Sequence, residues 1–365
     1  MKVKARVLAF YLPQYHPIPE NDRWWGKGFT EWTNVGKAKK YYPGQYEPRV
    51  PADLGYYDLR VPESREAQAD MARKYGIEGF VYWHYWFGNG KRLLERPFNE
   101  VLESGKPNFP FALAWANQSW KGFWHGLKDR NVLIEQTYSG DEDYIEHFNT
   151  ILPAFKDERY LKCDGKPIFF IYSPEELPNV KHFIELWQYL AQQNGLKGIF
   201  FVAIRHNLYD LECAKHEIDQ WKNVGFESIN VVNSFGKFKY KFWFRLLRSI
   251  FFKRLRIIPD LRLYESRAFK SPVDSDDFVI PSVLPDWDHT PRSGREGVAF
   301  VGSTPEKFKL IVKETLDSIM NKPFDRRFLM VKSWNEWAEG NYLEPDLRYG
   351  CQYLEAFKTV ISEDN

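Results

Sequence analysis

Eight short apolar runs recur along the chain, each five to seven residues long. They cover residues 7–11, 79–84, 111–115, 167–172, 198–204, 229–233, 280–284 and 328–334. Their apolar side chains occupy consecutive positions rather than every second one, which is typical of strands buried on both faces in a helix-covered parallel sheet. Helical patterns separate most of the runs, for example over 64–74, 141–155, 181–194 and 304–320. The chain therefore alternates strand and helix.

This alternation predicts an α/β fold of the (β/α)8, or TIM-barrel, type with long loops after the strands. The rival is an open doubly wound sheet, which needs a glycine-rich phosphate-binding turn after its first strand. Pro13-Gln14-Tyr15-His16-Pro17 follows the first run instead, so the barrel is favoured. No linker, repeat or low-complexity tract interrupts the chain, and we expect a single catalytic domain over residues 1–365.

Polar and aromatic side chains follow the apolar runs, at the strand ends where such barrels carry their functional sites. Flat rings beside amides, imidazoles and carboxylates suit a sugar, whose C–H face stacks and whose hydroxyls need donors and acceptors. The predicted substrate-binding residues are Tyr11, Gln14, His16, Trp24, Trp25, Glu31, Trp32, His84, Trp86, Trp115, Asn117, Gln118, Tyr172, Asp288, Trp334 and Asn335. The competing interpretation is that aromatic residues fill the core, and we apply it to Trp187, Trp221 and Trp243 in the helical segments.

The segment Trp334-Asn335-Glu336-Trp337-Ala338-Glu339-Gly340 holds two carboxylates three positions apart after the eighth run. If a helical turn follows the strand, both side chains lie on one face. Paired carboxylates break glycosidic bonds, one as acid and the other as base or nucleophile. Burial and like charge raise the pKa of one member, which keeps it protonated near neutral pH. We predict that Glu336 and Glu339 are catalytic; the alternative is a solvated pair at a helix start.

Composition sets limits on partners and compartment. The 51 Lys and Arg residues nearly balance 49 Asp and Glu residues, so overall charge favours no nucleic-acid partner. Three cysteines lie far apart and suggest neither a disulfide framework nor a metal site, and no cofactor is implied. The basic start is followed by an apolar run too short for a signal peptide, and no run is long enough for a membrane span. We expect a cytoplasmic protein.

One segment departs from this balance. Residues 237–256 interleave Lys and Arg with Phe, Trp, Leu and Ile and contain no acidic residue. Such a pattern predicts either peripheral contact with a membrane or an anionic ligand, or an outer barrel helix with a basic solvent face.

Several motifs together resemble one family. Residues 9–16, 24–35, 51–55, 84–87, 165–167 and 334–340 are similar to the WbsX-type glycosyltransferases, which occur with surface-polysaccharide genes and resemble, more distantly, the endo-α-mannosidase glycoside hydrolases of family ninety-nine. In that hydrolase family the first Glu of the last motif is a base on the sugar 2-hydroxyl, and the second is the acid and then the base at the leaving oxygen. The resemblance implies these roles for Glu336 and Glu339, a 1,2-anhydro intermediate and retained configuration.

The chain departs from the family patterns at three places. Ala338 stands where the mannosidases carry His, and Gln118 replaces a Glu usual in the WbsX-type motif. His289 replaces an Asn that usually follows Trp-Asp. Ala338 weakens the transfer of the mannosidases' substrate to this chain. If the Glu that Gln118 replaces holds a substrate hydroxyl or tunes an acid, we expect this member to differ from its family in specificity or rate.

The sequence is compatible with three functions. We favour hydrolysis or transglycosylation of an oligosaccharide or polysaccharide, endo-acting and retaining. The alternative is a glycosyltransferase of surface-polysaccharide synthesis, such as O-antigen or capsule. Its Asp-x-Asp candidates are Asp141-Glu142-Asp143 and Asp274-Ser275-Asp276, which we interpret as a helix start and a solvated loop. A non-catalytic glycan-binding barrel is the third possibility, and the presence of both glutamates argues against it.

Overall fold

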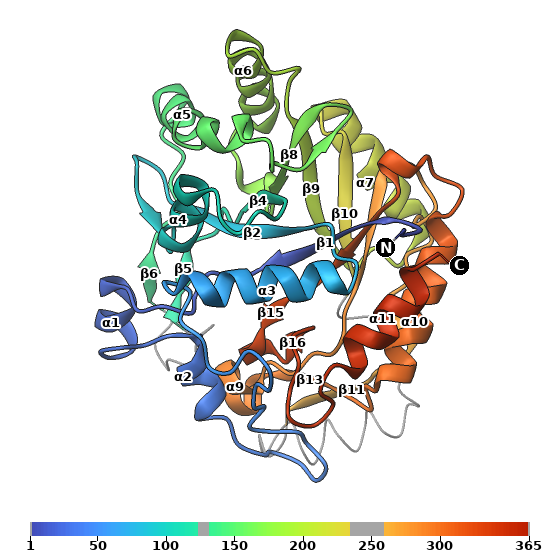
Figure 1. The fold of residues 1–365 in the computed structure, drawn as a ribbon. Coiled ribbons are helices and arrows are strands. Elements are labelled where there is room, and N and C mark those ends of the chain that lie inside the picture. Colours follow the sequence, from blue (N-terminus) through green and yellow to red (C-terminus); the bar gives the residue numbers. More distant parts are fainter. Residues whose placement is uncertain (1, 123–130, 234–258, 364–365) are drawn as a thin grey trace.

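The structure is a computed structural model in which residues 2–122, 131–233 and 259–363 are described. Within this part of the chain, parallel strands close into an eight-stranded barrel in the order β1-β2-β4-β8-β9-β10-β12-β14 and back to β1 (Figure 1). The strands are β1 (Arg6–Tyr11), β2 (Gly79–Trp86), β4 (Phe111–Trp115), β8 (Lys166–Ile171), β9 (Phe200–His206), β10 (Ser228–Val232), β12 (Val279–Val283) and β14 (Phe328–Val331). The predicted TIM barrel is confirmed, and closure excludes the open sheet: Ala9 pairs with Phe80 on one side and Val331 on the other.

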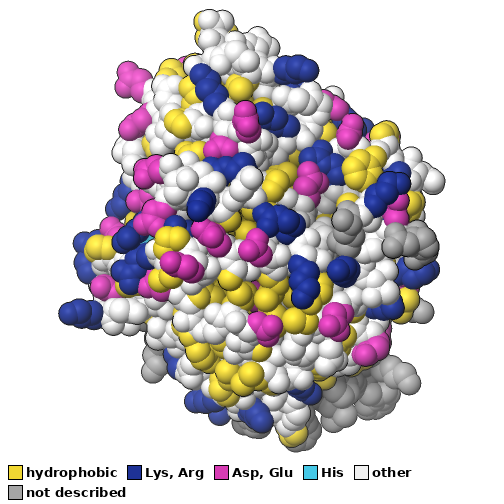
Figure 2. Space-filling view, viewed as in Figure 1, with side chains coloured by type: hydrophobic (Ala, Val, Ile, Leu, Met, Phe, Trp, Pro, Cys, Tyr) yellow, Lys and Arg dark blue, Asp and Glu magenta, His cyan; other side chains and the backbone are white. Residues whose placement is uncertain are grey.

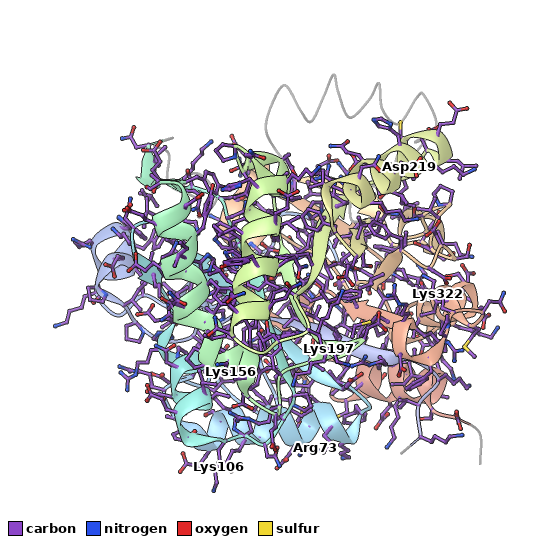
Figure 3. The ribbon with its side chains drawn as sticks, turned by 90° about the horizontal axis from the view of Figure 1, so that it is seen from above. Arg73, Lys106, Lys156, Lys197, Asp219 and Lys322 are labelled. Carbon is purple, nitrogen blue, oxygen red and sulfur yellow. The ribbon has the colours of Figure 1, made fainter. Side chains whose placement is uncertain are left out.

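Helices cover the outside of the barrel. The longer ones are α3 (Pro62–Lys74), α4 (Arg96–Ser104), α5 (Asp141–Lys156), α6 (Val180–Gln193), α7 (Leu211–Val224), α10 (Pro305–Ile319) and α11 (Gln352–Ile361). Figure 3 shows α5 and α6 side by side, with Lys156 and Lys197 at the same end of the two helices. Trp187 and Trp221 are buried on α6 and α7, as predicted for core residues. Trp243 and the basic segment 237–256 lie outside the described residues.

Shorter elements lie in the loops between the barrel strands and the outer helices. They are α1 (Pro19–Trp25), α2 (Glu31–Gly36), α9 (Thr290–Ser293), β3 (Arg92–Leu93), β5 (Trp120–Lys121), β6 (Val132–Ile134), β7 (Lys162–Cys163), β11 (Asp260–Leu263), β13 (Val298–Val301), β15 (Asn335–Glu336) and β16 (Asn341–Tyr342). Most of these, including α1, α2 and α9, gather in the lower part of Figure 1. These short helices and strands are parts of the long loops that the sequence predicted.

Both faces of the barrel strands are buried, because one faces the barrel interior and the other the helices. Every residue of β2 is buried. On β1, Phe10 stacks on Trp83 with ring centroids 4.7 Å apart, whereas the Tyr11 hydroxyl donates to Gln68 of α3. Neighbouring residues of a strand point to opposite faces, so hydrophobicity alone does not reveal which of them faces inward.

The surface carries no large field of one sign in the view shown. Figure 2 shows basic and acidic side chains intermixed over this face, in keeping with the net charge of +2. No helix in the described ranges combines the length and apolar character required to cross a bilayer.

Candidate active site

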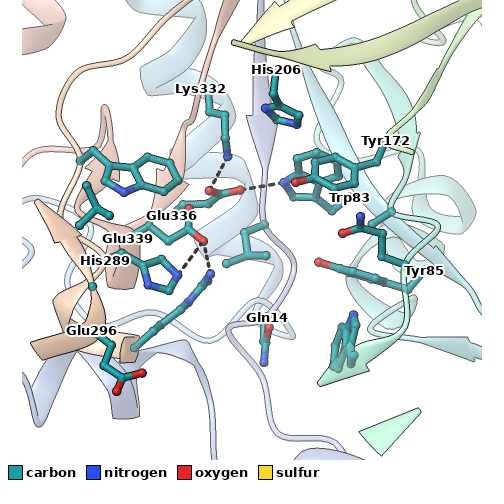
Figure 4. A pocket seen from close by; sticks show the side chains of 18 of the residues that line it. Gln14, Trp83, Tyr85, Tyr172, His206, His289, Glu296, Lys332, Glu336 and Glu339 are labelled. Carbon is teal, nitrogen blue, oxygen red and sulfur yellow. Dashed lines mark hydrogen bonds and ion pairs between the residues drawn. The ribbon is translucent and has the colours of Figure 1, made fainter. Parts of the chain in front are cut away.

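A pocket of about 520 Å³ lies at the C-terminal ends of the barrel strands (Figure 4). The described residues that line it are Leu12, Gln14, Trp83, Tyr85, Ala116, Gln118, Trp120, Tyr172, His206, Asn207, Trp287, His289, Arg292, Glu296, Gly297, Val298, Lys332, Glu336 and Glu339. They come from the ends of β1, β2, β4, β8, β9, β12 and β14 and from the loop elements beyond these strands. The walls combine aromatic rings with charged groups, as a sugar site requires.

Glu336 is held on both carboxylate oxygens. Trp83 Nε1 donates to Oε1 at 2.8 Å, and Lys332 Nζ donates to Oε2 at 2.9 Å. Ser333 Oγ accepts from the Glu336 backbone N–H at 3.0 Å. Burial raises the pKa of Glu336, and the nearby ammonium opposes this rise. Burial lowers the pKa of Lys332, but Glu336 and Glu339 raise it by more, so the ammonium stays charged.

Glu339 is held by an arginine that it shares with a third carboxylate. Arg292 Nη1 donates to Glu339 Oε1, while Arg292 Nε donates to Glu31 Oε1 at 2.7 Å. Burial opposes the charge of Arg292, but Glu31 and Glu339 raise its pKa. His289 Nε2 lies 3.7 Å from the same Glu339 oxygen. A cation therefore lies beside each of the two glutamates of the pair.

The backbone around Glu339 requires glycine at the next position. The Glu339 carbonyl accepts from the Asp288 backbone N–H at 2.6 Å, which joins the loops after β12 and β14. Gly340 adopts φ +62°, and a Cβ there would lie 2.7 Å from Asp288 N. The close approach and the left-handed backbone both exclude a side chain.

The histidines of the pocket are neutral near physiological pH. Burial lowers the pKa of His206 to about 4, and Lys332 and Arg205 act in the same direction. Burial also lowers the pKa of His289 to about 3, and Arg292 adds to this. The fixed positive charge of the pocket thus comes from Lys332 and Arg292 among its described lining residues.

Five of the predicted site residues line the pocket together: Gln14, Gln118, Tyr172, Glu336 and Glu339. Tyr172 contacts both Trp83 and His206, with ring centroids 5.7 and 5.4 Å away. Gln118 donates to Ser173 Oγ at 2.8 Å, so its side chain is anchored to the loop after β8.

The structure places other predicted residues on the outer face of the barrel, behind the pocket. His84 and His147 of α5 meet at their Nε2 atoms, 2.8 Å apart. Trp86 Nε1 donates to Asp143 at 3.0 Å, and Trp115 packs against Phe183 of α6. Tyr11 contacts α3 in the same way. These side chains alternate with the inward-facing ones, so the closed barrel places His84 and Trp86 on the face of β2 that points away from the pocket.

The remaining predicted residues support the loops rather than lining the pocket. Trp334 and Asn335 are fully buried, and Asn335 Oδ1 accepts from the Leu12 backbone N–H at 2.7 Å. Asn117 donates to the Ser173 carbonyl at 2.7 Å. Further residues of this kind are His16 beside the Pro13 carbonyl, Trp24 and Trp25 packed on each other, Glu31 beneath Arg292, Trp32 against Trp337, and Asp288 bonded to Gln45.

Several lining residues were missed by the prediction. Trp83 and Tyr85 lie on either side of His84 in sequence, and the two-residue period of a strand would have placed them together on one face. Trp287 and His289 likewise flank Asp288. No comparable sequence pattern points to Arg292. Its place in the site depends on contacts with residues that lie far from it along the chain.

The Asp-x-Asp stretches have structural partners. Asp141 begins α5, and Asp143 Oδ1 accepts from the Asn89 backbone N–H at 2.7 Å as well as from Trp86. Asp274 Oδ2 accepts from the Ser271 backbone N–H at 2.9 Å. Among the residues that the structure describes, no group of His, Cys, Asp and Glu side chains is arranged to hold a metal ion.

Comparison with known proteins matches this sequence to one family. A family model described as Glycosyltransferase WbsX matches residues 7–357. The chain is similar to WxcX of Xanthomonas campestris pv. campestris strain B100, described as an uncharacterized protein, with 32% identity over 98% of this chain and 50% of that protein. The chain spans about half the length of the curated relatives it matches.

Solved structures share the fold at low sequence identity. A glycoside hydrolase-like protein gives a TM-score of 0.62 at 13% identity, covering 99% of this chain and 94% of its own. The GH99 endo-alpha-mannosidase from Bacteroides thetaiotaomicron gives a TM-score of 0.56 at 15% identity, covering 97% and 95%.

Proposed function

Because the chain belongs to the glycosyltransferase WbsX family, we propose that it is a carbohydrate-active enzyme that breaks or transfers a glycosidic bond in an oligosaccharide or polysaccharide. The observation that carries the proposal is that Glu336 and Glu339 share one aromatic-walled pocket, each beside a cation. Two carboxylates on either side of a reacting bond are the usual equipment for glycoside cleavage.

In the proposed reaction, Glu336 is the base and Glu339 the acid. Glu336 removes the proton of the sugar 2-hydroxyl, whose oxygen attacks C1 as Glu339 protonates the departing oxygen and the C1–O bond breaks. A 1,2-anhydro sugar results. Glu339 then takes a proton from a water molecule, whose oxygen attacks C1 and opens the three-membered 1,2-anhydro ring. Glu336 returns its proton to O2. Two inversions at C1 retain configuration, and an acceptor hydroxyl in place of water gives transglycosylation.

The pocket's charges support this assignment. Both oxygens of Glu336 accept from N–H donors, which favours a carboxylate that stays ionised until it receives the 2-hydroxyl proton. Trp83, Tyr85, Tyr172 and Trp287 offer flat faces for sugar rings. An uncharged substrate fits best, because the pocket's two fixed cations are already paired with carboxylates.

Transfer from a sugar nucleotide is the second candidate, since the family description names a glycosyltransferase. A nucleotide donor brings a diphosphate, which needs cations or backbone N–H groups. Among the described lining residues, Lys332 and Arg292 would each have to leave a carboxylate to bind it. We therefore rank hydrolysis or transglycosylation of an existing glycan first.

The test is turnover of defined oligosaccharides by the purified protein. α-Linked manno-oligosaccharides are the first probes, because one enzyme of similar fold is the GH99 endo-alpha-mannosidase from Bacteroides thetaiotaomicron. Proton NMR of the first product identifies the anomer, and we expect retention. Glu336→Gln and Glu339→Gln should each reduce kcat by a factor of about 100 or more, as expected on loss of an acid or base.

Glu296→Gln is the matched control, because it removes a carboxylate from the same pocket without touching the pair. Its loss of kcat should be much smaller. Turnover that survives both Gln substitutions would refute the assigned residues. Turnover that requires a sugar nucleotide would favour the transferase, and glycan binding without turnover would favour a binding barrel.

A further inference from the structure

Tyr15 lies in the loop that follows β1, and the proposed reaction gives it no role. Its side chain is 0% exposed and does not line the pocket, so a substrate bound there does not contact it. The ring packs against Trp32 and Tyr57, with centroids 4.7 and 5.1 Å away. The Tyr15 carbonyl accepts from the Leu59 backbone N–H at 3.1 Å. Tyr15 is therefore anchored by segments other than the one that carries the glutamate pair.

The hydroxyl of Tyr15 bridges the residues on either side of Glu336. It donates to the Asn335 carbonyl, and it accepts from the Trp337 backbone N–H at 3.2 Å. Both backbone groups belong to buried residues, where an unpaired polar group is costly. Burial raises the pKa of Tyr15, and nearby carboxylates raise it further, so the hydroxyl keeps the proton that it donates. One hydroxyl thus pairs with a donor and an acceptor of the backbone around Glu336.

The backbone changes direction at Glu336. This residue ends β15 and is followed directly by a single 3-10 turn over Trp337–Glu339. The ladder before the turn is short: Asn335 and Glu336 pair with Tyr342 and Asn341. A two-stranded ribbon of this length has little stability of its own, so its geometry depends on contacts from neighbouring segments. The hydroxyl bridge spans the point at which the strand becomes the turn.

The course of this backbone decides whether the Glu336 carboxylate reaches its partners. Trp83 and Lys332 donate to its two oxygens at 2.8 and 2.9 Å (Figure 4). Such bonds extend to only about 3.2 Å, so a backbone shift of about 1 Å would weaken or break them. A misplacement of about 1 Å at a reacting group can lower a rate by a factor of about 100.

We propose that Tyr15 is a positioning residue, whose hydroxyl fixes the backbone on both sides of Glu336 and thereby places the carboxylate that acts as the base. The proposal rests on the proposed function and adds to it a residue that acts through Glu336 without contacting the substrate. The alternative is that the hydroxyl contributes stability alone, as a buried hydrogen-bonded group does.

Tyr160 provides a matched control. Its hydroxyl also bridges two backbone groups: it donates to the Ile168 carbonyl at 3.0 Å and accepts from the Leu113 N–H at 3.1 Å. Tyr160 is 2% exposed, and neither it nor its two partners line the pocket. Tyr15→Phe and Tyr160→Phe therefore remove the same atom from the same kind of bridge, and urea unfolding should show similar losses of stability.

The kinetic test compares these two variants with the wild-type protein on the oligosaccharide that it cleaves. We expect Tyr15→Phe to lower kcat by a factor of about 10 to 100, because the base is displaced. KM should change much less, since no contact with the substrate is lost. Tyr160→Phe should retain the wild-type kcat and KM. Equal losses of kcat in the two variants, or a wild-type kcat in Tyr15→Phe, would overturn the proposal.

A second measurement needs no substrate. The indole N–H of Trp83 donates to Glu336, and its nuclear magnetic resonance signal in isotope-labelled protein is identified by its loss in Trp83→Phe. Tyr15→Phe should shift this signal, and Tyr160→Phe should not. A shift in a protein that cleaves no glycan would support the positioning of Glu336 and refute the proposed function. An unshifted signal in Tyr15→Phe would overturn the proposal even if kcat falls.

Ser333→Ala keeps the proposal testable if Tyr15→Phe does not fold. Ser333 Oγ accepts from the Glu336 backbone N–H at 3.0 Å, so this variant loosens the same stretch of backbone at another atom. It should lower kcat and shift the Trp83 signal. Wild-type values of both would show that hydrogen bonds to this backbone do not place the carboxylate, and would overturn the proposal.

Discussion

The ammonium of Lys332 lies 2.9 Å from Oε2 of Glu336, and both side chains are almost completely buried at the end of the eighth barrel strand. Buried ion pairs add little net stability compared with apolar packing, but removing one partner leaves an uncompensated charge. Net stability therefore does not explain this pair. Its electrostatic effect is that the Lys332 ammonium opposes the rise in the pKa of Glu336 that burial causes.

Replacement of Lys332 by Met tests this explanation. Burial already raises the pKa of Glu336, and without the opposing ammonium the pKa should rise further. The ionised base would then form only at higher pH, so the acid limb of the kcat/KM profile should move upward. A pH-rate series measures this shift. Lys332→Arg retains the charge and should keep the limb near its wild-type position; a profile that is unchanged in Lys332→Met would refute the explanation.

Two tryptophans on opposite faces of β2 form a matched pair for mutation. Trp83→Phe retains a ring to stack on Phe10 but loses the N–H that donates to Glu336. Since a hydrogen bond to a charged group contributes about 1.5–3 kcal/mol, kcat should fall by a factor of about 10 to 100. Trp86→Phe loses its bond to Asp143 behind the barrel. Stability should drop there while kcat changes little, and equal kcat losses in both variants would contradict the assigned faces.

Gly340→Ala should damage both stability and catalysis. The new Cβ would lie 2.7 Å from Asp288 N and 2.9 Å from Arg49 Cζ, at φ +62°. The left-handed backbone alone costs about 1 kcal/mol, and the steric contacts add to this. Urea unfolding measures the first effect and kcat the second. Gly195→Ala is the control, because φ is +79° there but nothing lies within 4 Å; it should lose about 1 kcal/mol and retain kcat.

Buried histidines predict that stability falls in mild acid. Burial lowers the pKa of His16 to about 4, below its ordinary value of 6.5. Between these two pH values the unfolded chain binds a proton that the folded protein does not, so stability is present above about pH 6.5 and is lost as pH falls toward 4. The slope for one such group is about 1.4 kcal/mol per pH unit. Urea unfolding from pH 7 to 4 should show a smaller dependence of stability on pH in His16→Gln than in the wild-type protein, and an equal dependence in both would contradict this prediction.

The fold could be predicted from the sequence because the barrel strands are buried on both faces. All eight apolar runs became barrel strands, from β1 to β14. The helices α3, α5, α6 and α10 also lie where the pattern predicted them. Glu336 and Glu339 could be found for a related reason: a barrel brings the ends of its strands to one face, so a carboxylate pair after the eighth strand points to the site.

Because both faces of each barrel strand are buried, the sequence does not show which face points into the barrel. His84 and Trp86 resemble Trp83 and Tyr85 in size and polarity, and all four are buried. An alternating strand reveals its core side by hydrophobicity, but a strand covered on both sides does not. That successive side chains of a strand point to opposite faces could be predicted from the sequence. Which of these side chains face the pocket was decided only by closure of the barrel.

By itself, the sequence determined the barrel, its strand ends and the carboxylate pair, because local pattern and chain order carry that information. Only the tertiary structure decided what surrounds the pair. Glu31 and Arg292 are 261 positions apart, and Trp83 and Glu336 are 253 apart. Ion pairs and hydrogen bonds depend on distances of a few ångströms, and sequence spacing says nothing about such distances until the chain has folded.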